Sequence, residues 1–359
     1  MRVLQLIDSL HSGGAERMAV NYANALESRV EGSFLCCTRS EGLLKEKLNP
    51  SVGFLFLKKK ATLDFRALFR LRNYILKNDI DLIQAHGTSW FFAALVKMTC
   101  PKLKLVWHDH YGKELKDRKT GVLYVFSNIF NGIISVNTEL KDWAIEKLRA
   151  KNVIYVTNFL AEQNCSGEIF LKGKGTFNLL CIANFRPQKD HINLLKAFKL
   201  AFINKPDVSL HLVGKFEEGP YYDEIKKYLL DNEMENKVYL YGEQKDVKQF
   251  LKQAQLGVLS SKSEGLPLAL LEYGLNALPV VCTAVGECPE VLGNCGILVE
   301  PGKPKALAEA MNFYYHNLLA RDKDRICFER KVKNNYTEGK VVSEVIRFFA
   351  TLTTKKGRI

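Results

Sequence analysis

Two glutamates, Glu264 and Glu272, stand eight residues apart in the segment SSKSEGLPLALLEYGLNALPVV, residues 260–281. Carboxylate oxygens accept hydrogen bonds from hydroxyl groups, which sugars and riboses carry. Pro267 lies between the glutamates and suits the first position of a helix, where its missing N–H costs no hydrogen bond. The first N–H groups of that helix, near Leu268, have no internal partners and favour a phosphate. The segment therefore predicts a ligand with hydroxyls and phosphate, with the two glutamates on different parts of it.

A second group suited to binding is basic. Arg186 and Lys189 lie in CIANFRPQKDHINLLKAF, between an apolar run and a helical pattern. Cations near the start of a helix oppose its dipole, so a bound anion explains them better than solvent does. A guanidinium and an ammonium together can neutralise a diphosphate leaving group.

The elements that must position these groups are short apolar runs that alternate with helical patterns. This alternation is typical of parallel sheets covered by helices, whose ligands lie at the carboxyl ends of the strands. The polar stretch 161–176 separates two such series and marks a domain boundary. The expected strands are 3–7, 33–38, 53–57, 82–85, 103–107, 132–136 and 153–156 before it, and 178–183, 209–213, 238–241, 256–259, 279–282 and 296–299 after it.

The string SEGLP at 263–267, followed by Glu272 and Gly274, resembles the E-x7-E motif of retaining glycosyltransferases of the GT-B fold, in glycosyltransferase family 4. The resemblance implies an α/β protein with two Rossmann-like doubly wound domains that face each other across a cleft. In that family the first glutamate contacts hydroxyls of the donor sugar and the second contacts the nucleotide ribose. Backbone between them meets the diphosphate and the sugar. These donor-binding roles fall here on Glu264, Gly265, Leu266, Leu268 and Glu272.

Three further matches extend the resemblance over most of the chain. Arg186 and Lys189 match the family's basic pair on the donor diphosphate. Gly13 and Gly14, in LHSGGAERMAVNYANAL, match an N-terminal glycine loop in which backbone approaches the donor phosphate and sugar. His108, in KLVWHDHYGKE, matches the histidine near the reacting sugar. The resemblance thus gives catalytic roles to His108, Glu264, Arg186 and Lys189.

Other residues are assigned more weakly. His86, in the strand-end loop of IQAHGTSW, and His110, in the loop of His108, are predicted to contact the acceptor. Gln244 follows the strand 238–241 and is predicted to lie near the base of the donor.

No metal and no cofactor other than the donor substrate are expected. His108-x-His110 has no further ligand at a convincing spacing. Asp79-Ile-Asp81 spells D-x-D, but it precedes a strand, which is the wrong end for a ligand site.

The net charge of +13 is uneven. Residues 1–160 hold 24 Lys and Arg against 15 Asp and Glu, which favours an anionic partner. No basic-aromatic motif or helix-turn-helix pattern occurs, so nucleic acid is not expected. The amphipathic basic helix 64–77 suits an anionic membrane surface, or an ordinary domain helix whose arginines extend to water. A glycan acceptor linked to polyprenyl pyrophosphate at the inner face of the cell membrane fits the resemblance.

The start of the chain, MRVLQLIDSL, does not match a secretion signal, because its apolar stretch is short and interrupted by Asp8. Nine scattered cysteines without a CxxC pair then predict reduced thiols in a cytoplasmic protein.

The predicted domains are residues 1–165, which bind the acceptor, and 166–338, which bind the nucleotide sugar. By resemblance, residues 339–359 contain a helix that crosses back to the first domain. The predicted function is a retaining, metal-independent hexosyltransferase that uses a nucleotide-diphosphate sugar in surface polysaccharide synthesis. UDP and GDP remain open as the nucleotide. The alternatives are a sugar-nucleotide 2-epimerase of the same fold and a non-catalytic sugar-nucleotide-binding subunit.

Overall fold

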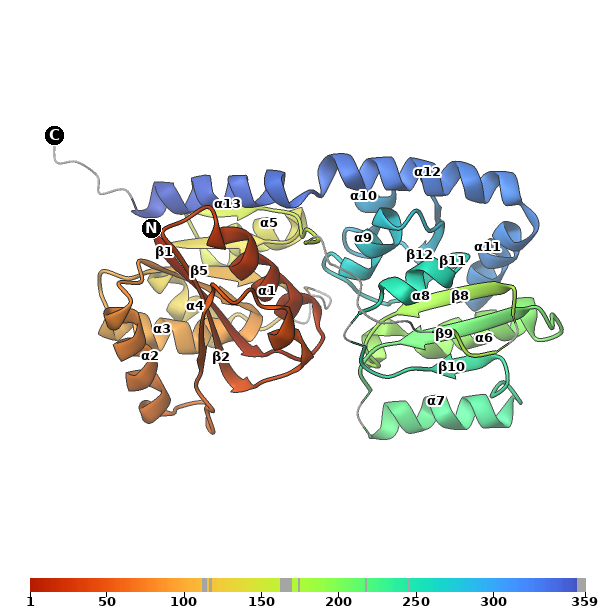
Figure 1. Ribbon diagram of the computed structural model, residues 1–359, viewed down its shortest axis with the longest axis horizontal. Coiled ribbons are helices and arrows are strands. Elements are labelled where there is room, and N and C mark those ends of the chain that lie inside the picture. Colours follow the sequence, from red (N-terminus) through yellow and green to blue (C-terminus); the bar gives the residue numbers. More distant parts are fainter. Residues whose placement is uncertain are drawn as a thin grey trace. The chain divides into compact units, whose positions relative to one another are not determined.

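The computed structural model describes residues 1–111, 115, 118–161, 170–173, 175–216, 218–244 and 246–353. The chain divides into two compact units (Figure 1). Unit 1 contains residues 1–161 and 338–359, and unit 2 contains residues 162–337. The boundary at residues 161 and 162, where the chain passes from unit 1 to unit 2, thus falls at the start of the polar stretch 161–176.

Unit 1 is built on a seven-stranded parallel sheet with the strand order β3-β2-β1-β4-β5-β6-β7. Most of its strands are buried, which is why they read as continuous apolar runs in the sequence. The strands are β1 (Arg2–Ser9), β2 (Gly32–Ser40), β3 (Gly53–Phe56), β4 (Leu82–His86), β5 (Lys104–Asp109), β6 (Gly132–Ser135) and β7 (Val153–Tyr155).

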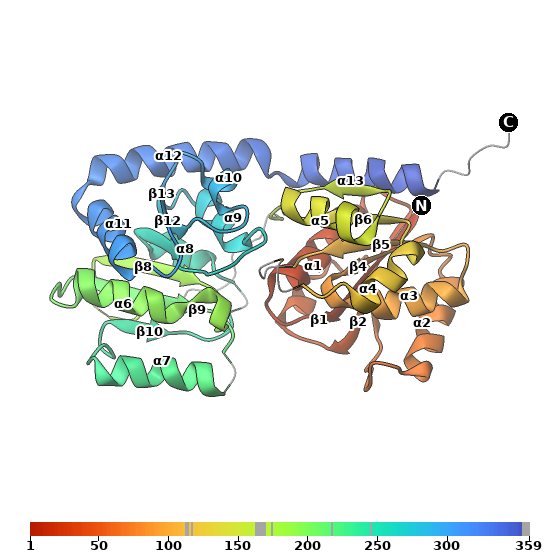
Figure 2. The same cartoon turned by 180° about the vertical axis from the view of Figure 1, so that it is seen from behind.

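Helices cover both faces of this sheet (Figure 2). Successive side chains of a strand point to opposite faces. Leu105 and Trp107 are two residues apart in β5 and therefore lie on the same face. Leu105 packs with residues of α2 and α3, and Trp107 packs with residues of α4 and α5. On the other face, Ile7 packs with α1, and α13 meets Gly132. The helices are α1 (Gly14–Glu27), η1 (Leu43–Lys47), α2 (Phe65–Lys77), η2 (Gly87–Ser89), α3 (Trp90–Thr99), α4 (Gly121–Phe126), η4 (Ser127–Ile129), α5 (Thr138–Leu148) and α13 (Glu338–Thr353).

Unit 2 repeats the architecture with a six-stranded parallel sheet of order β10-β9-β8-β11-β12-β13. Its strands are β8 (Phe177–Ile182), β9 (Val208–Val213), β10 (Val238–Leu240), β11 (Leu256–Leu259), β12 (Val280–Thr283) and β13 (Ile297–Val299). Its helices are η5 (Pro187–Lys189), α6 (His191–Phe202), α7 (Pro220–Asp231), α8 (Lys248–Gln253), α9 (Leu268–Leu275), α10 (Cys288–Leu292), α11 (Pro304–His316) and α12 (Leu318–Asn335). The predicted α/β class is therefore confirmed.

Two local predictions were wrong. Pro267 is the N-cap of α9 rather than its first residue, because its extended ψ of 122° lies outside the helix. The prediction of reduced thiols fails for Cys295 and Cys327, which form a disulfide across 32 residues. Six other cysteines in the described residues are free and buried.

None of the helices in the described residues is both long enough and apolar enough to span a membrane.

Candidate active site

The loop between β11 and α9 carries the first glutamate and is fixed from two sides. The Ser260 hydroxyl donates to the carbonyls of Lys189 and Asp190, at 3.0 and 3.1 Å. The Thr283 hydroxyl donates to the carbonyl of Ser261 at 2.7 Å. The loop is therefore tied both to β12 and to the segment that follows β8, although 71 residues separate Ser260 from Lys189.

This arrangement brings two predicted catalytic residues into contact. Lys189 Nζ lies 2.5 Å from Glu264 Oε1, and the Ser261 hydroxyl donates to the same oxygen at 2.6 Å. The two side chains are only 21% and 8% exposed, so solvent screens their attraction weakly. The pair therefore presents a fixed cation next to a fixed acceptor, which is the chemistry that a phosphorylated sugar requires.

A glycine closes the loop on its other side. Gly286 has a φ of +52°, and a Cβ there would lie 2.2 Å from the backbone oxygen of Glu264. The next residue, Glu287, donates its backbone N–H to the carbonyl of Gly265 at 2.9 Å. A side chain at 286 would displace the backbone that carries Glu264.

The remaining donor residues of unit 2 occupy different environments. Glu272 lies on α9 and is buried at 5% exposure, so it is not an ordinary surface glutamate. Arg186 is exposed just before η5. Gln244 donates to the carbonyl of Tyr241 at 2.7 Å within its own loop, and its predicted contact with a base stays a prediction. Leu266 and Leu268, which follow Glu264 by two and four residues, are buried.

The glycine loop of unit 1 leaves room for a ligand. Gly13 is the N-cap of α1, and Gly14 is its first residue. A Cβ at Gly13 would meet only the end of the flexible Glu16 side chain, and a Cβ at Gly14 would meet no described atom within 4 Å. Neither glycine is required by packing, which is consistent with a close backbone approach to a bound group.

Two of the three predicted histidines, His86 and His108, lie on strands rather than in the loops expected, whereas His110 lies in its predicted loop. His86 is the last residue of β4 and His108 is in β5, and both are completely buried. His110 follows β5 and is partly exposed. The strand register explains why they meet, since His86 pairs with His108, and Gln5 of β1 pairs with Gln84 of β4.

Hydrogen bonds join these polar side chains on the α1 face of the sheet. His86 Nε2 lies 2.7 Å from Gln5 Oε1, and its Nδ1 lies 3.0 Å from His110 Nε2. The Gln84 amide lies 2.8 Å from His108 Nδ1. Burial lowers the pKa of His86 and of His108 well below the usual value, and lowers the pKa of His110 to about 3. All three imidazoles are therefore neutral at pH 7.

A buried ion pair holds the chain that follows the histidines. Both Asp109 oxygens accept from the Arg118 guanidinium, at 2.7 and 2.9 Å. The guanidinium also lies 4.0 Å from the ring centre of Trp143 and 4.3 Å from that of Tyr111. Burial raises the pKa of Asp109, while Arg118 opposes this shift. Sequence reasoning missed this pair because Arg118 belongs to no motif.

Comparisons with known proteins agree with this architecture. Residues 12–163 match the family described as Glycosyltransferase Family 4, and residues 168–327 match Glycosyl transferases group 1. The O-antigen biosynthesis glycosyltransferase WbnH of Escherichia coli is 28% identical over 296 residues, which cover 80% of this chain and 82% of WbnH.

A second Escherichia coli relative is the UDP-Gal:alpha-D-GlcNAc-diphosphoundecaprenol alpha-1,3-galactosyltransferase. It is 23% identical over 300 residues, which cover 76% of each chain. Among solved structures, Anabaena Alr3699/HepE in complex with UDP-glucose aligns with a TM-score of 0.83 at 18% identity, covering 98% of this chain and 100% of that one.

Two parallel α/β units and this structural likeness define the GT-B fold, as the resemblance implied. The chain belongs to glycosyltransferase family 4, with a group 1 glycosyltransferase region in its second half.

Proposed function

We propose that the protein is a retaining hexosyltransferase that moves a sugar from a UDP-sugar to a hydroxyl of a glycan acceptor in surface polysaccharide synthesis. The observation that carries this proposal is the contact of Lys189 with Glu264, with Arg186 nearby in the sequence and Glu272 buried on the following helix. The names of WbnH and of the galactosyltransferase support the polysaccharide role. The galactosyltransferase and HepE support uridine diphosphate as the nucleotide.

The proposed reaction breaks the bond between the anomeric carbon of the sugar and the diphosphate. The acceptor oxygen forms its bond to that carbon on the same face, and its proton passes to an oxygen of the leaving diphosphate. Lys189 and Arg186 stabilise the negative charge that develops on the diphosphate. Glu264 accepts hydrogen bonds from sugar hydroxyls, and Glu272 from the ribose. These cations supply the charge stabilisation that a metal ion provides in other enzymes, so no metal takes part in the proposed reaction.

The ion pair gives Glu264 a second role before the donor binds. Lys189 is partly buried, and a buried charge is costly unless it is paired. Glu264 and its partner Ser261 keep the ammonium in place, so little reorganisation is needed when a diphosphate arrives. The family assignment of His108 to the donor sugar, and of His86 and His110 to the acceptor, remains part of the proposal.

A thermal-shift titration tests the donor site. A ligand that binds only the folded state at 100 times its Kd adds about 2.7 kcal/mol of stability. We expect UDP and UDP-sugars to raise the unfolding temperature more than GDP and GDP-sugars do. Glu272→Ala is expected to abolish most of the shift, whereas Glu309→Ala, on α11, leaves it unchanged.

Three outcomes would contradict the proposal in different ways. A shift that persists in Glu272→Ala would place the nucleotide elsewhere. Binding without transfer to any acceptor extract would favour the non-catalytic subunit. Conversion of the sugar nucleotide without an acceptor would favour the 2-epimerase.

The proposed acceptor is linked to a polyprenyl pyrophosphate, as in the named galactosyltransferase. Such an acceptor requires contact with a membrane, and α2 supplies a surface for it. Leu68 and Ile75 of this helix are buried, but Phe65, Phe69 and Leu76 are 67%, 56% and 52% exposed. The apolar residues of this helix therefore fall on two faces, and the face with Phe65, Phe69 and Leu76 remains uncovered within unit 1. We place the protein at the inner face of the cell membrane, held there by this exposed face and by basic residues of the same helix, Arg66, Arg70 and Lys77.

Cosedimentation with anionic lipid vesicles tests the membrane contact. Phe65→Ser combined with Phe69→Ser is expected to lower vesicle binding about 10-fold or more, because burial of a phenylalanine contributes about 1.5–3 kcal/mol. The matched control is Leu230→Ser, on α7 and 63% exposed, which should bind as the wild type does. Equal loss in both variants, or no binding by the wild type, would refute this contact.

A further inference from the structure

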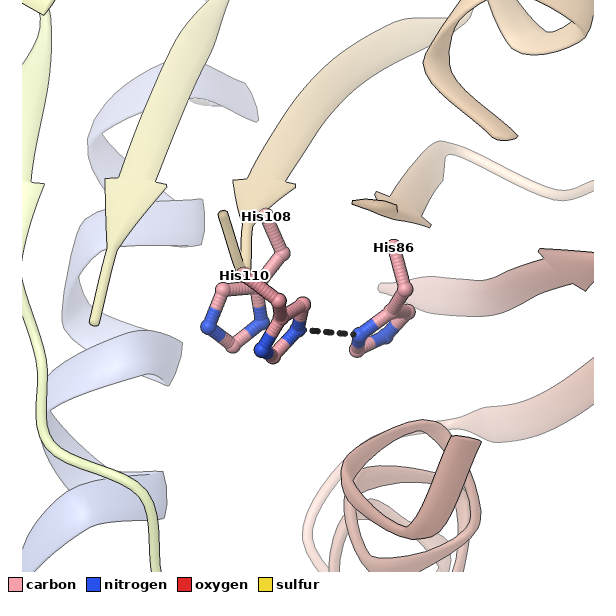
Figure 3. Close-up of side chains that lie close together, drawn as sticks. All are labelled: His86, His108 and His110. Carbon is pink, nitrogen blue, oxygen red and sulfur yellow. Dashed lines mark hydrogen bonds between the residues drawn. The ribbon is translucent and has the colours of Figure 1, made fainter. Parts of the chain in front are cut away.

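Three histidines of unit 1 bring ring nitrogens toward one point (Figure 3). One nitrogen from each of His86, His108 and His110 lies within 4.8 Å of the other two. His86 Nδ1 and His110 Nε2 are already 3.0 Å apart. Zn–N bonds of about 2.0–2.1 Å in a tetrahedral site place ligand nitrogens roughly 3.3 Å apart. A side-chain movement on the order of 1 Å therefore closes the three nitrogens around an ion.

Two glutamines contact the ring nitrogens of His86 and His108 that face away from the proposed ion. A histidine ligand generally donates its other N–H to an oxygen, which fixes its orientation. Gln5 Oε1 lies 2.7 Å from His86 Nε2 and accepts its N–H, so Nδ1 keeps its lone pair. Gln84 occupies the same place beside His108 Nδ1. A half-turn of its amide presents oxygen to that nitrogen and leaves the lone pair on His108 Nε2.

Two buried polar atoms of this cluster have no partner among the residues that the structure describes. His108 Nε2 and Gln84 Oε1 are both buried and have no hydrogen-bond partner within the described part of the chain. Leaving a buried polar atom unpaired costs roughly 1–3 kcal/mol. The half-turn of Gln84 gives its oxygen the partner that its amide nitrogen has now, and an ion would give His108 Nε2 a partner. His108 Nε2 is thus open to an ion, whereas the same ion would replace the hydrogen bond between His86 Nδ1 and His110 Nε2.

The chemistry of the donors selects the ion. The three side chains offer imidazole nitrogens, which bind metals in their neutral form. Asp109, the nearest carboxylate in the sequence, is held by Arg118. Imidazole nitrogen suits Zn²⁺, Co²⁺ and Ni²⁺, whereas Mg²⁺ and Mn²⁺ prefer oxygen.

We propose that His86, His108 and His110 form a binding site for one Zn²⁺-type transition-metal ion, with a fourth position open to solvent or a ligand. His110 is partly exposed and provides the side from which an ion enters. The site goes beyond the proposed transfer reaction, which needs no metal. An ion on His108 also excludes a contact between that nitrogen and a sugar, so metal loading is expected to slow transfer.

Metal binding to the full chain without a histidine tag tests the site. The protein is treated with a chelator, titrated with Co²⁺ or Zn²⁺, and analysed for metal content after gel filtration. We expect one equivalent of either ion, visible absorption bands of low-symmetry Co²⁺, and no stoichiometric Mg²⁺. Circular dichroism confirms that each variant is folded.

Two variants and one control separate this site from adventitious binding. His110→Gln changes a partly exposed side chain and is expected to weaken Zn²⁺ binding more than about 100-fold. Gln84→Leu is expected to weaken it about 10–100-fold, as loss of an outer partner does. His316→Gln removes an exposed histidine of α11 and should change nothing.

The site is refuted if the wild type retains no ion, or if His110→Gln and His316→Gln bind with equal affinity. Stoichiometric Mg²⁺ binding would equally overturn the choice of metal. These measurements do not involve the donor site of unit 2, so they stand or fall separately from the proposed transfer reaction.

Discussion

Lys189→Ala is expected to lower turnover of a nucleotide-sugar donor on the order of 10²-fold or more, and Arg186→Ala by a similar factor. Each variant removes a positive charge that stabilises the leaving diphosphate. Lys189→Ala also leaves the Glu264 carboxylate, 8% exposed, without its nearest cation. We therefore expect it to affect both kcat and KM, whereas the exposed Arg186 should act mainly on kcat.

The matched control for this result is Lys262→Ala. Lys262 lies two residues from Glu264 and pairs with Asp190 at 3.4 Å, but its side chain is 58% exposed. Solvent screens this exposed ammonium although Asp190 is buried, so turnover should stay close to that of the wild type. Near-wild-type rates for both Lys189→Ala and Arg186→Ala would refute the donor site.

A double variant shows whether Lys189 and Glu264 act as a unit. If Glu264→Gln and Lys189→Ala each disable the same arrangement, their combined loss will be smaller than the product of the single losses. Multiplicative losses would mean that the two side chains contact the donor independently.

Local sequence was sufficient to predict the strands of this fold. A strand buried on both faces of a parallel sheet is apolar at every position, as 256–259 is, so it stands out without an alternating pattern. Helix boundaries and faces were harder. Pro267 fits either the N-cap or the first turn by chain geometry alone. The exposure of Phe65 and Phe69 depends on which side of α2 meets the sheet.

The residues of the candidate site could be predicted, but most of their contacts could not. Glu264 and Glu272 belong to one short motif, and their spacing is visible in the chain. The contact between Lys189 and Glu264 joins residues 75 apart through the order of β8 and β11. Gln5 and Gln84 become neighbours only through the register of β1 and β4. Sheet order and register come from packing of the whole domain, which single motifs do not encode.

The disulfide could not be predicted for the same reason. Cys295 and Cys327 follow no spacing rule, because their proximity depends on how α12 lies against the segment after α10.

The alternation of polar and apolar residues within two strands, by contrast, is visible in the sequence and could have indicated the polar cluster. Gln5 stands between the buried Leu4 and Leu6, and Gln84 stands between Ile83 and Ala85. Polar residues at alternate positions of otherwise apolar strands indicated a polar region on one face of the sheet.

Gly286→Ala is expected to disable the donor site without replacing any residue assigned to donor binding. The new Cβ would lie 2.2 Å from the backbone oxygen of Glu264 and 2.6 Å from that of Gly265. Backbone cannot rotate away as a side chain does, so the loop that carries Glu264 must move. A displacement of about 1 Å at a positioning group can cost 10²-fold in rate. We expect a loss of that order in kcat/KM, together with loss of the thermal shift by UDP.

The control for Gly286→Ala separates this clash from backbone strain. Gly302 has a similar φ of +69° against +52°, but a Cβ there meets no described atom within 4 Å. Gly302→Ala should therefore lose only the roughly 1–2 kcal/mol that a left-handed conformation costs alanine, and it should retain the response to UDP. The two variants are compared by urea unfolding and by donor titration. Equal stability and equal donor response in both would mean that Gly286 does not position the Glu264 loop, and that Lys189 and Ser261 alone hold the carboxylate in place.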